Sequence, residues 1–171
     1  MKTVQHAVCA ALAGLALVGC GAKTEPPSDF GRMLTGNDID LITKGKTLSS
    51  QRVTVVGYPM MCTIRTKFRV GDMIGTEIHV EPNCTSKFIG SAKIRIDRTA
   101  AAKPDMFASG TRVRNALLVD GQFSSDTISY LSDDYQVIPP KTPMRISGIV
   151  TYTDPSASVP ILESVVLGNA I

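Results

Sequence analysis

The chain has 171 residues and carries 18 lysines and arginines against 15 aspartates and glutamates, a formal net charge of +3. This length suits one domain with a sizeable core, and so slight a basic excess leaves no electrostatic footprint for nucleic acid. Tryptophan is absent and aromatic residues make up 5% of the chain, which argues against an aromatic platform for stacking sugars or bases.

Residues 1–19 have the features of a bacterial signal peptide. Lys2 supplies the positive charge, and an apolar and small-residue run from Ala7 to Val18 follows it. The run is shorter than the about 20 residues that a membrane-spanning helix needs. It ends in Leu17-Val18-Gly19-Cys20, which resembles the lipobox of bacterial lipoproteins. The alternatives are an ordinary signal peptide with a chance cysteine, or an uncleaved N-terminal anchor.

The lipobox resemblance implies cleavage before Cys20 and acylation of its thiol, which anchors the chain to a lipid bilayer. Residues 20–31 then form the lipidated N-terminus and a polar, proline-containing tether, and residues 32–171 form a single domain. Gly21 follows the lipidated position, where an aspartate would favour retention in the inner membrane in enterobacteria-like sorting. We therefore expect a location at the outer membrane, facing the periplasm.

The first predicted element of the domain is a short helix, and strands follow it. Residues 36–45 have early acids, a late lysine and a terminal glycine, which is typical of a helix. Residues 52–58 predict a strand that Pro59 halts. A turn at Gly71-Asp72 then leads into a strand over residues 74–80, which completes a hairpin with the segment before it.

That segment, residues 62–70, has the clearest alternation in the chain. Its apolar-side positions, which we expect to share one face, are Ile64, Thr66, Phe68 and Val70. Its basic positions, on the other face, are Arg65, Lys67 and Arg69. Alternation of this kind predicts a half-buried strand.

The second half of the chain predicts four more elements and no internal repeat. Strands are expected over residues 92–97, with Ile94 and Ile96 pointing inward, and over residues 111–119. Residues 124–131 predict a short helix entered by Ser-Ser-Asp. Strands over residues 144–153 and 161–167 close the domain, with Pro155 in the turn between them.

Two stretches resemble bacterial periplasmic OB-fold proteins. Residues 52–58 are an apolar run that ends in Gly57 and Tyr58, like the opening strand of such barrels, and residues 145–150 and 160–167 look like their closing hairpin. The resemblance implies a mainly β fold, a Greek-key barrel of five or six strands with one or two short helices, and no particular ligand. Gly57 and Gly148 would permit the sharp strand coiling of a small barrel. A β-sandwich of similar strand count is the competing fold.

The chain has four cysteines. Cys9 leaves with the signal peptide and Cys20 is acylated, so Cys62 and Cys84 remain as one pair. In an oxidising compartment that pair predicts a disulfide. A metal site would need further His or Cys ligands, and a redox-active pair is usually spaced Cys-x-x-Cys, so both are weaker alternatives.

His79 is the one histidine left after cleavage, and it shares an expected strand face with Glu77 and Glu81. One imidazole and two carboxylates suit a divalent metal, but neighbours two apart on a strand converge poorly. We therefore expect a solvated face with a local ion pair, and no metal, no cofactor and no catalytic residue. Neither a Gly-x-Ser-x-Gly elbow nor a phosphate-binding glycine loop occurs.

Arg65, Lys67 and Arg69 are the remaining candidate ligand-facing residues. They suit an anionic envelope polymer, although Glu77 and Glu81 on the neighbouring strand would neutralise them. We therefore expect a non-enzymatic lipoprotein that binds an envelope protein or polymer, or braces an assembly, with no nucleic-acid partner. The alternatives are a metal-dependent or hydrolytic enzyme that uses His79, and a surface-exposed exclusion or inhibitor lipoprotein.

Overall fold

The computed structural model describes residues 30–44, 48–63, 68–98, 114–119, 123–153 and 159–170. The predicted signal peptide, Cys20, nearly all of the predicted tether, Arg65, Lys67 and Pro155 lie outside these ranges. The described residues form one helix, α1 (Gly36–Lys44), and nine strands: β1 (Arg32–Met33), β2 (Arg52–Met60), β3 (Met73–His79), β4 (Phe88–Arg98), β5 (Ala116–Val119), β6 (Ile128–Leu131), β7 (Val137–Ile138), β8 (Met144–Thr151) and β9 (Ile161–Asn169).

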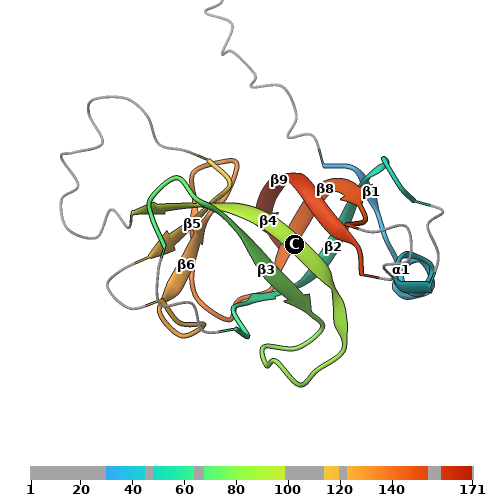
Figure 1. Cartoon of the computed structure of the whole chain (residues 1–171), viewed down its shortest axis with the longest axis horizontal. Coiled ribbons are helices and arrows are strands. Elements are labelled where there is room, and N and C mark those ends of the chain that lie inside the picture. The colour runs from blue at the N-terminus through green and yellow to red at the C-terminus, as the bar shows by residue number, and fades with distance from the viewer. Residues whose placement is uncertain are drawn as a thin grey trace, which may run out of the picture.

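Five of the strands close into a barrel (Figure 1). β2 pairs with β3, β3 with β4, β4 with β9, β9 with β8, and β8 returns to β2. Only the β4–β9 pair of this ring is parallel. The closed barrel is consistent with an OB fold and confirms the predicted fold class. It decides against the β-sandwich.

The two glycines expected to coil the strands lie where strands approach each other closely. A Cβ on Gly57 would lie 2.8 Å from the carbonyl oxygen of His79, where β2 leaves β8 and begins to pair with β3. A Cβ on Gly148 would lie 2.7 Å from the Cβ of Leu162, at a register shift between β8 and β9. Both glycines therefore permit contacts that no other residue allows without movement.

The strands outside the barrel extend its sheet. β9 pairs with β4 at Ser91–Ala92, and β5 takes over as the parallel partner of β4 from Arg95. β6 and β7 continue from β5, so this extension and α1 lie on opposite sides of the barrel (Figure 1). Ile42 of α1, Ile146 of β8 and Tyr130 of β6 all belong to one hydrophobic core.

The helix α1 begins where the sequence predicts, because the residue before it is Thr35. The backbone N–H of Thr35 donates to Oδ2 of Asp38, and the Thr35 hydroxyl donates to the same oxygen. The side chain of the third helical residue thus bonds back to the N–H of the residue before the helix, which is one of the two contacts of a capping box. Ile42 then enters the core from the far end of the helix. Within the described ranges, no helix combines the length and apolar character needed to cross a bilayer.

Two predicted boundaries are wrong. Pro59 does not halt β2, which continues to Met60. At Pro59 the strand has already left β8 and pairs with β3 alone, and a strand with one free edge tolerates a residue without an N–H. The predicted strand over residues 62–70 is wrong at both described ends, because neither residues 61–63 nor residues 68–70 lie in a strand. The hairpin partners of β3 are β2 and β4 instead.

The predicted helix over residues 124–131 is also wrong. Ser124 does start one helical turn, in which its carbonyl accepts the N–H groups of Thr127 and Ile128. The chain then enters β6, because Ile128 and Tyr130 are buried in the core and suit a strand.

The turn at Gly71-Asp72 is confirmed, and Gly71 has a φ of 98°.

Candidate functional site

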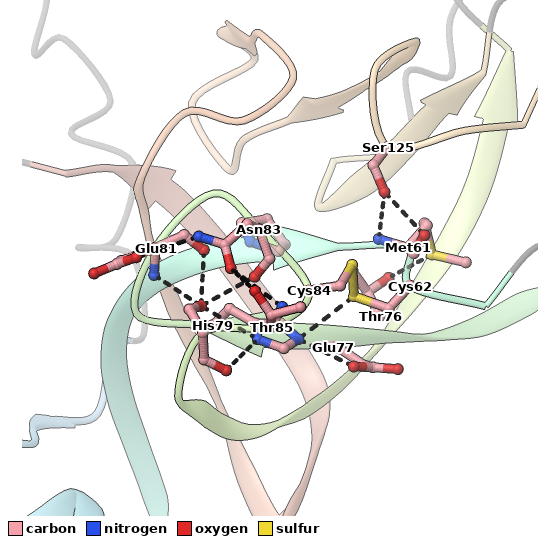
Figure 2. The surroundings of a disulfide bond; sticks show 12 residues. Met61, Cys62, Thr76, Glu77, His79, Glu81, Asn83, Cys84, Thr85 and Ser125 are labelled. Carbon is pink, nitrogen blue, oxygen red and sulfur yellow. Dashed lines mark hydrogen bonds and ion pairs between the residues drawn. A yellow bond between two sulfur atoms is a disulfide. The ribbon is translucent and has the colours of Figure 1, made fainter.

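The predicted disulfide joins Cys62 and Cys84, with an S–S distance of 2.03 Å. Cys62 follows the end of β2, and Cys84 lies in the loop between β3 and β4. The bond therefore ties the start of the β2–β3 loop to the β3–β4 hairpin (Figure 2). Cys84 is exposed, whereas Cys62 is partly buried.

His79 lies beside this disulfide and is buried, with 2% of its surface exposed. It is the last residue of β3, and its register neighbours are Tyr58 on β2 and Phe88 on β4. The Phe88 ring meets the imidazole edge-on at 5.7 Å. The solvated face expected for His79 is therefore wrong, because the hairpin loop and the disulfide cover it.

Both ring nitrogens of His79 have partners. Nδ1 lies 3.2 Å from the carbonyl oxygen of Ser86, and Nε2 lies 3.0 Å from Oε2 of Glu77. The hydroxyl oxygen of Ser86 also lies 3.5 Å from Nδ1, so Nδ1 has both a carbonyl and a hydroxyl within reach. The Glu77 carboxylate accepts hydrogen bonds, so Nε2 is the ring nitrogen that carries a hydrogen toward it.

Nε2 also faces the disulfide. Sγ of Cys62 lies 3.5 Å from it, and Figure 2 shows one ring nitrogen directed toward both the sulfur and the Glu77 carboxylate. The expected ion pair on this face is thus present between Glu77 and His79. Glu81 takes no part, since β3 ends at His79 and the Glu81 carboxylate accepts the side-chain amide of Asn83.

Cys62, Glu77 and His79 place one potential metal-ligand atom each within 4.8 Å of one another. With the sulfur of Cys62 held in the disulfide, the imidazole and one carboxylate are left as ligands. Zinc sites generally use three or four protein ligands. The oxidised chain therefore offers a hydrogen-bonded cluster at this place that falls short of a zinc ligand set.

A second feature lies at the other end of the β2–β3 loop. Arg69, Val70, Met73 and Arg95 are exposed there, and we call these four residues the loop patch. Met73 is the register partner of Arg95, and a Cβ on Gly71 would lie 3.8 Å from a guanidinium nitrogen of Arg95. Val70 and Met73 are 50% and 57% exposed, high values for apolar side chains of their size.

The loop patch contains one of the three predicted ligand-facing residues. The backbone N–H of Arg69 donates to Oδ2 of Asp72, which shapes the turn before β3. Sequence reasoning missed Met73 and Arg95, because Arg95 comes from β4 and reaches the loop only through strand pairing. It also missed Ser86 as the partner of His79, which the hairpin loop brings back over the strand.

Comparisons with known protein families, with curated proteins and with solved structures found no match.

Proposed function

We propose that this chain is a lipid-anchored lipoprotein of the outer membrane whose barrel faces the periplasm and binds another envelope protein without catalysing a reaction. The loop patch carries the proposal. It joins two exposed apolar side chains to two exposed arginines at one edge of the barrel. Methionine and arginine are enriched in protein–protein interfaces relative to the rest of a protein surface.

The position of the loop patch supports its use as a binding surface. OB folds bind oligonucleotides and oligosaccharides on the face of their second and third strands and on the loop between their first two strands. In this barrel those elements are β3, β4 and the β2–β3 loop. The patch spans all three, through Met73, Arg95 and Arg69.

The environment of His79 supports a binding role over a catalytic one. A general base needs access to a substrate proton, but His79 is buried and both of its nitrogens are held by Ser86 and Glu77. The position is better explained as a support for the hairpin loop. The membrane anchor is supported by the lipobox resemblance at Cys20 alone.

Site-specific photo-crosslinking in living cells tests the proposal. A photoreactive residue replaces Met73, and a matched control replaces Leu41, which is 52% exposed on α1 at the opposite side of the barrel. We expect one discrete protein adduct from position 73 that position 41 does not give. Arg69→Glu together with Arg95→Glu should abolish it.

Three results would contradict the proposal: no adduct from position 73, the same adduct from both positions, or an adduct that survives both charge reversals. A polydisperse adduct resistant to protease and degraded by glycan-cleaving enzymes would identify an anionic polymer in place of a protein.

A further inference from the structure

We infer that the Cys62–Cys84 disulfide exchanges with thiols in one fixed direction, in which a thiolate attacks Cys84 and Cys62 departs beside His79. The inference rests on the geometry of the disulfide and does not depend on the proposed function. It turns the predicted structural disulfide into a site of covalent modification at Cys84.

The two sulfur-bearing residues differ in how accessible and how firmly held they are. Cys84 is exposed in the β3–β4 loop. Cys62 follows Met61, which is buried and whose backbone N–H and carbonyl both bond to the hydroxyl of Ser125, at 3.1 and 2.9 Å. Figure 2 shows this clamp on the side of Cys62 away from the hairpin loop. A thiolate therefore reaches Cys84 first, and Cys62 stays in place when the bond breaks.

The contact with His79 stabilises the departing sulfur. Nε2 of His79 lies 3.5 Å from Sγ of Cys62 and carries a hydrogen, since the Glu77 carboxylate accepts from Nε2. A hydrogen-bond donor beside a departing thiolate lowers the energy of that thiolate, and a thiol that leaves more readily speeds exchange. The Glu77 carboxylate lies within 4.8 Å of the same sulfur and opposes part of this effect. No comparable group contacts Cys84 among the residues that the structure describes.

The groups that face the imidazole come from three elements and one loop. They are the Glu77 carboxylate on β3, the Cys62 sulfur after β2, the Tyr58 side chain opposite on β2, the Phe88 ring on β4, and the carbonyl and hydroxyl of Ser86 in the loop. Of these, Glu77 is the carboxylate.

The exchange balances as two thiol–disulfide steps. The thiolate of a dithiol reductant attacks Sγ of Cys84 and forms a mixed disulfide, and Cys62 leaves with the electron pair as a thiolate beside Nε2 of His79. The Cys62 thiolate then takes up a proton from water. The second thiol of the reductant then attacks its own sulfur in the mixed disulfide and releases Cys84. Two electrons pass from the dithiol to the protein, and the dithiol becomes a disulfide.

Trapping the intermediate tests the direction of attack. The purified oxidised chain is exposed briefly to reduced glutathione, quenched in acid and analysed by peptide mass spectrometry. We expect glutathione on the Cys84 peptide and a free thiol on the Cys62 peptide. Glutathione on Cys62, or equally on both, would overturn the inference.

Reduction kinetics test the role of His79. With dithiothreitol as the reductant, His79→Gln should slow reduction about tenfold, because the leaving thiolate loses the N–H donor that the ring holds beside it. Glu81→Gln is the matched control. It removes a carboxylate of the β3–β4 loop that does not contact the imidazole, and it should leave the rate of reduction unchanged. Equal rates for His79→Gln and the wild type would overturn the inference.

The trapping experiment uses the wild-type chain, so it decides the direction of attack whether or not His79→Gln folds. The binding test above uses the oxidised chain, so either proposal can fail without the other.

Discussion

The hydroxyl of Tyr130 makes a buried polar contact between β6 of the β5–β7 extension and β2 of the barrel. Tyr130 is 1% exposed, and its hydroxyl donates to the carbonyl oxygen of Pro59 at 3.0 Å. Burial raises the pKa of this phenol far above its usual value, so it remains a donor at every ordinary pH. The contact also satisfies a carbonyl of β2 beyond the point where β8 pairs with that strand.

Replacing Tyr130 with phenylalanine removes the donor and keeps the packing of the aromatic ring. We expect the free energy of unfolding to fall by about 1–3 kcal/mol, because the Pro59 carbonyl remains buried without its partner. Urea unfolding followed by circular dichroism measures the change. Tyr135→Phe, at a residue 38% exposed, should change stability by less than about 0.5 kcal/mol. Equal effects of the two substitutions would disprove this account.

His79 illustrates what sequence predicts at the scale of one residue. The alternation of two correctly places Glu77 and His79 on one face of a strand, and their contact follows from it. The burial of His79 was not predictable, because the loop that covers it folds back through the Ser86 contact and the disulfide. Neither the Ser86 contact nor the disulfide can be predicted from the alternation of residues around His79.

At the scale of the element, α1 depends on Asp38 for its first turn. The pKa of Asp38 is lowered mainly by the hydrogen bond from the Thr35 backbone N–H, then by the one from the Thr35 hydroxyl, with Arg32 adding a smaller attraction. An aspartate whose pKa is lower in the folded chain stabilises the fold above its unfolded pKa. That contribution disappears as the pH falls through the folded pKa.

Asp38→Asn should therefore lower stability near pH 6 and have progressively less effect toward pH 2. The measurement is the free energy of unfolding of both chains across that range, with the Asp38 carboxyl titrated directly by NMR in the wild type. A difference between the two chains that stays constant with pH would mean that the carboxylate charge contributes nothing.

Elements with strong local signals were predicted well, and elements set by distant contacts were not. The helix at residues 36–44 has its own cap, and the strands around Ile94 and Ile146 have clear apolar patterns. The alternation over residues 62–70 was misleading. Cys62 is held by its disulfide and Phe68 packs at 4.7 Å against Phe123, so the described ends of this segment serve as loop anchors.

At the scale of the whole molecule, the disulfide joins two loops at one end of the barrel across a sequence separation of 22 residues. Replacing both cysteines, Cys62→Ala with Cys84→Ala, should lower the free energy of unfolding by about 3 kcal/mol through the larger entropy of the unfolded chain. Chemical denaturation measures it under non-reducing conditions. If the double variant and the oxidised wild type unfold at the same denaturant concentration, the bond contributes no stability.

The barrel itself was predictable from two stretches of sequence, whereas its extension was not. The opening strand and the closing hairpin contain the glycines that a small barrel needs, so the fold class followed from them. The extension is fixed by contacts such as Asn115, whose side-chain oxygen accepts the N–H of Leu167 at 2.7 Å. Asp133 donates its own N–H to the Leu167 carbonyl, and neither contact has a sequence signature.

The parallel pairing of β4 with β9 also dictates the order in which the molecule can assemble. Ser91 pairs with Ile161, and Val53 pairs with Gly148, so two of the five strand pairs in the barrel join segments that lie far apart along the chain. Until the last strand arrives, β4 and β8 both present open edges that invite pairing with other chains. Contacts so distant along the chain slow folding, which makes the interval before barrel closure the stage at which a chaperone would protect this protein most.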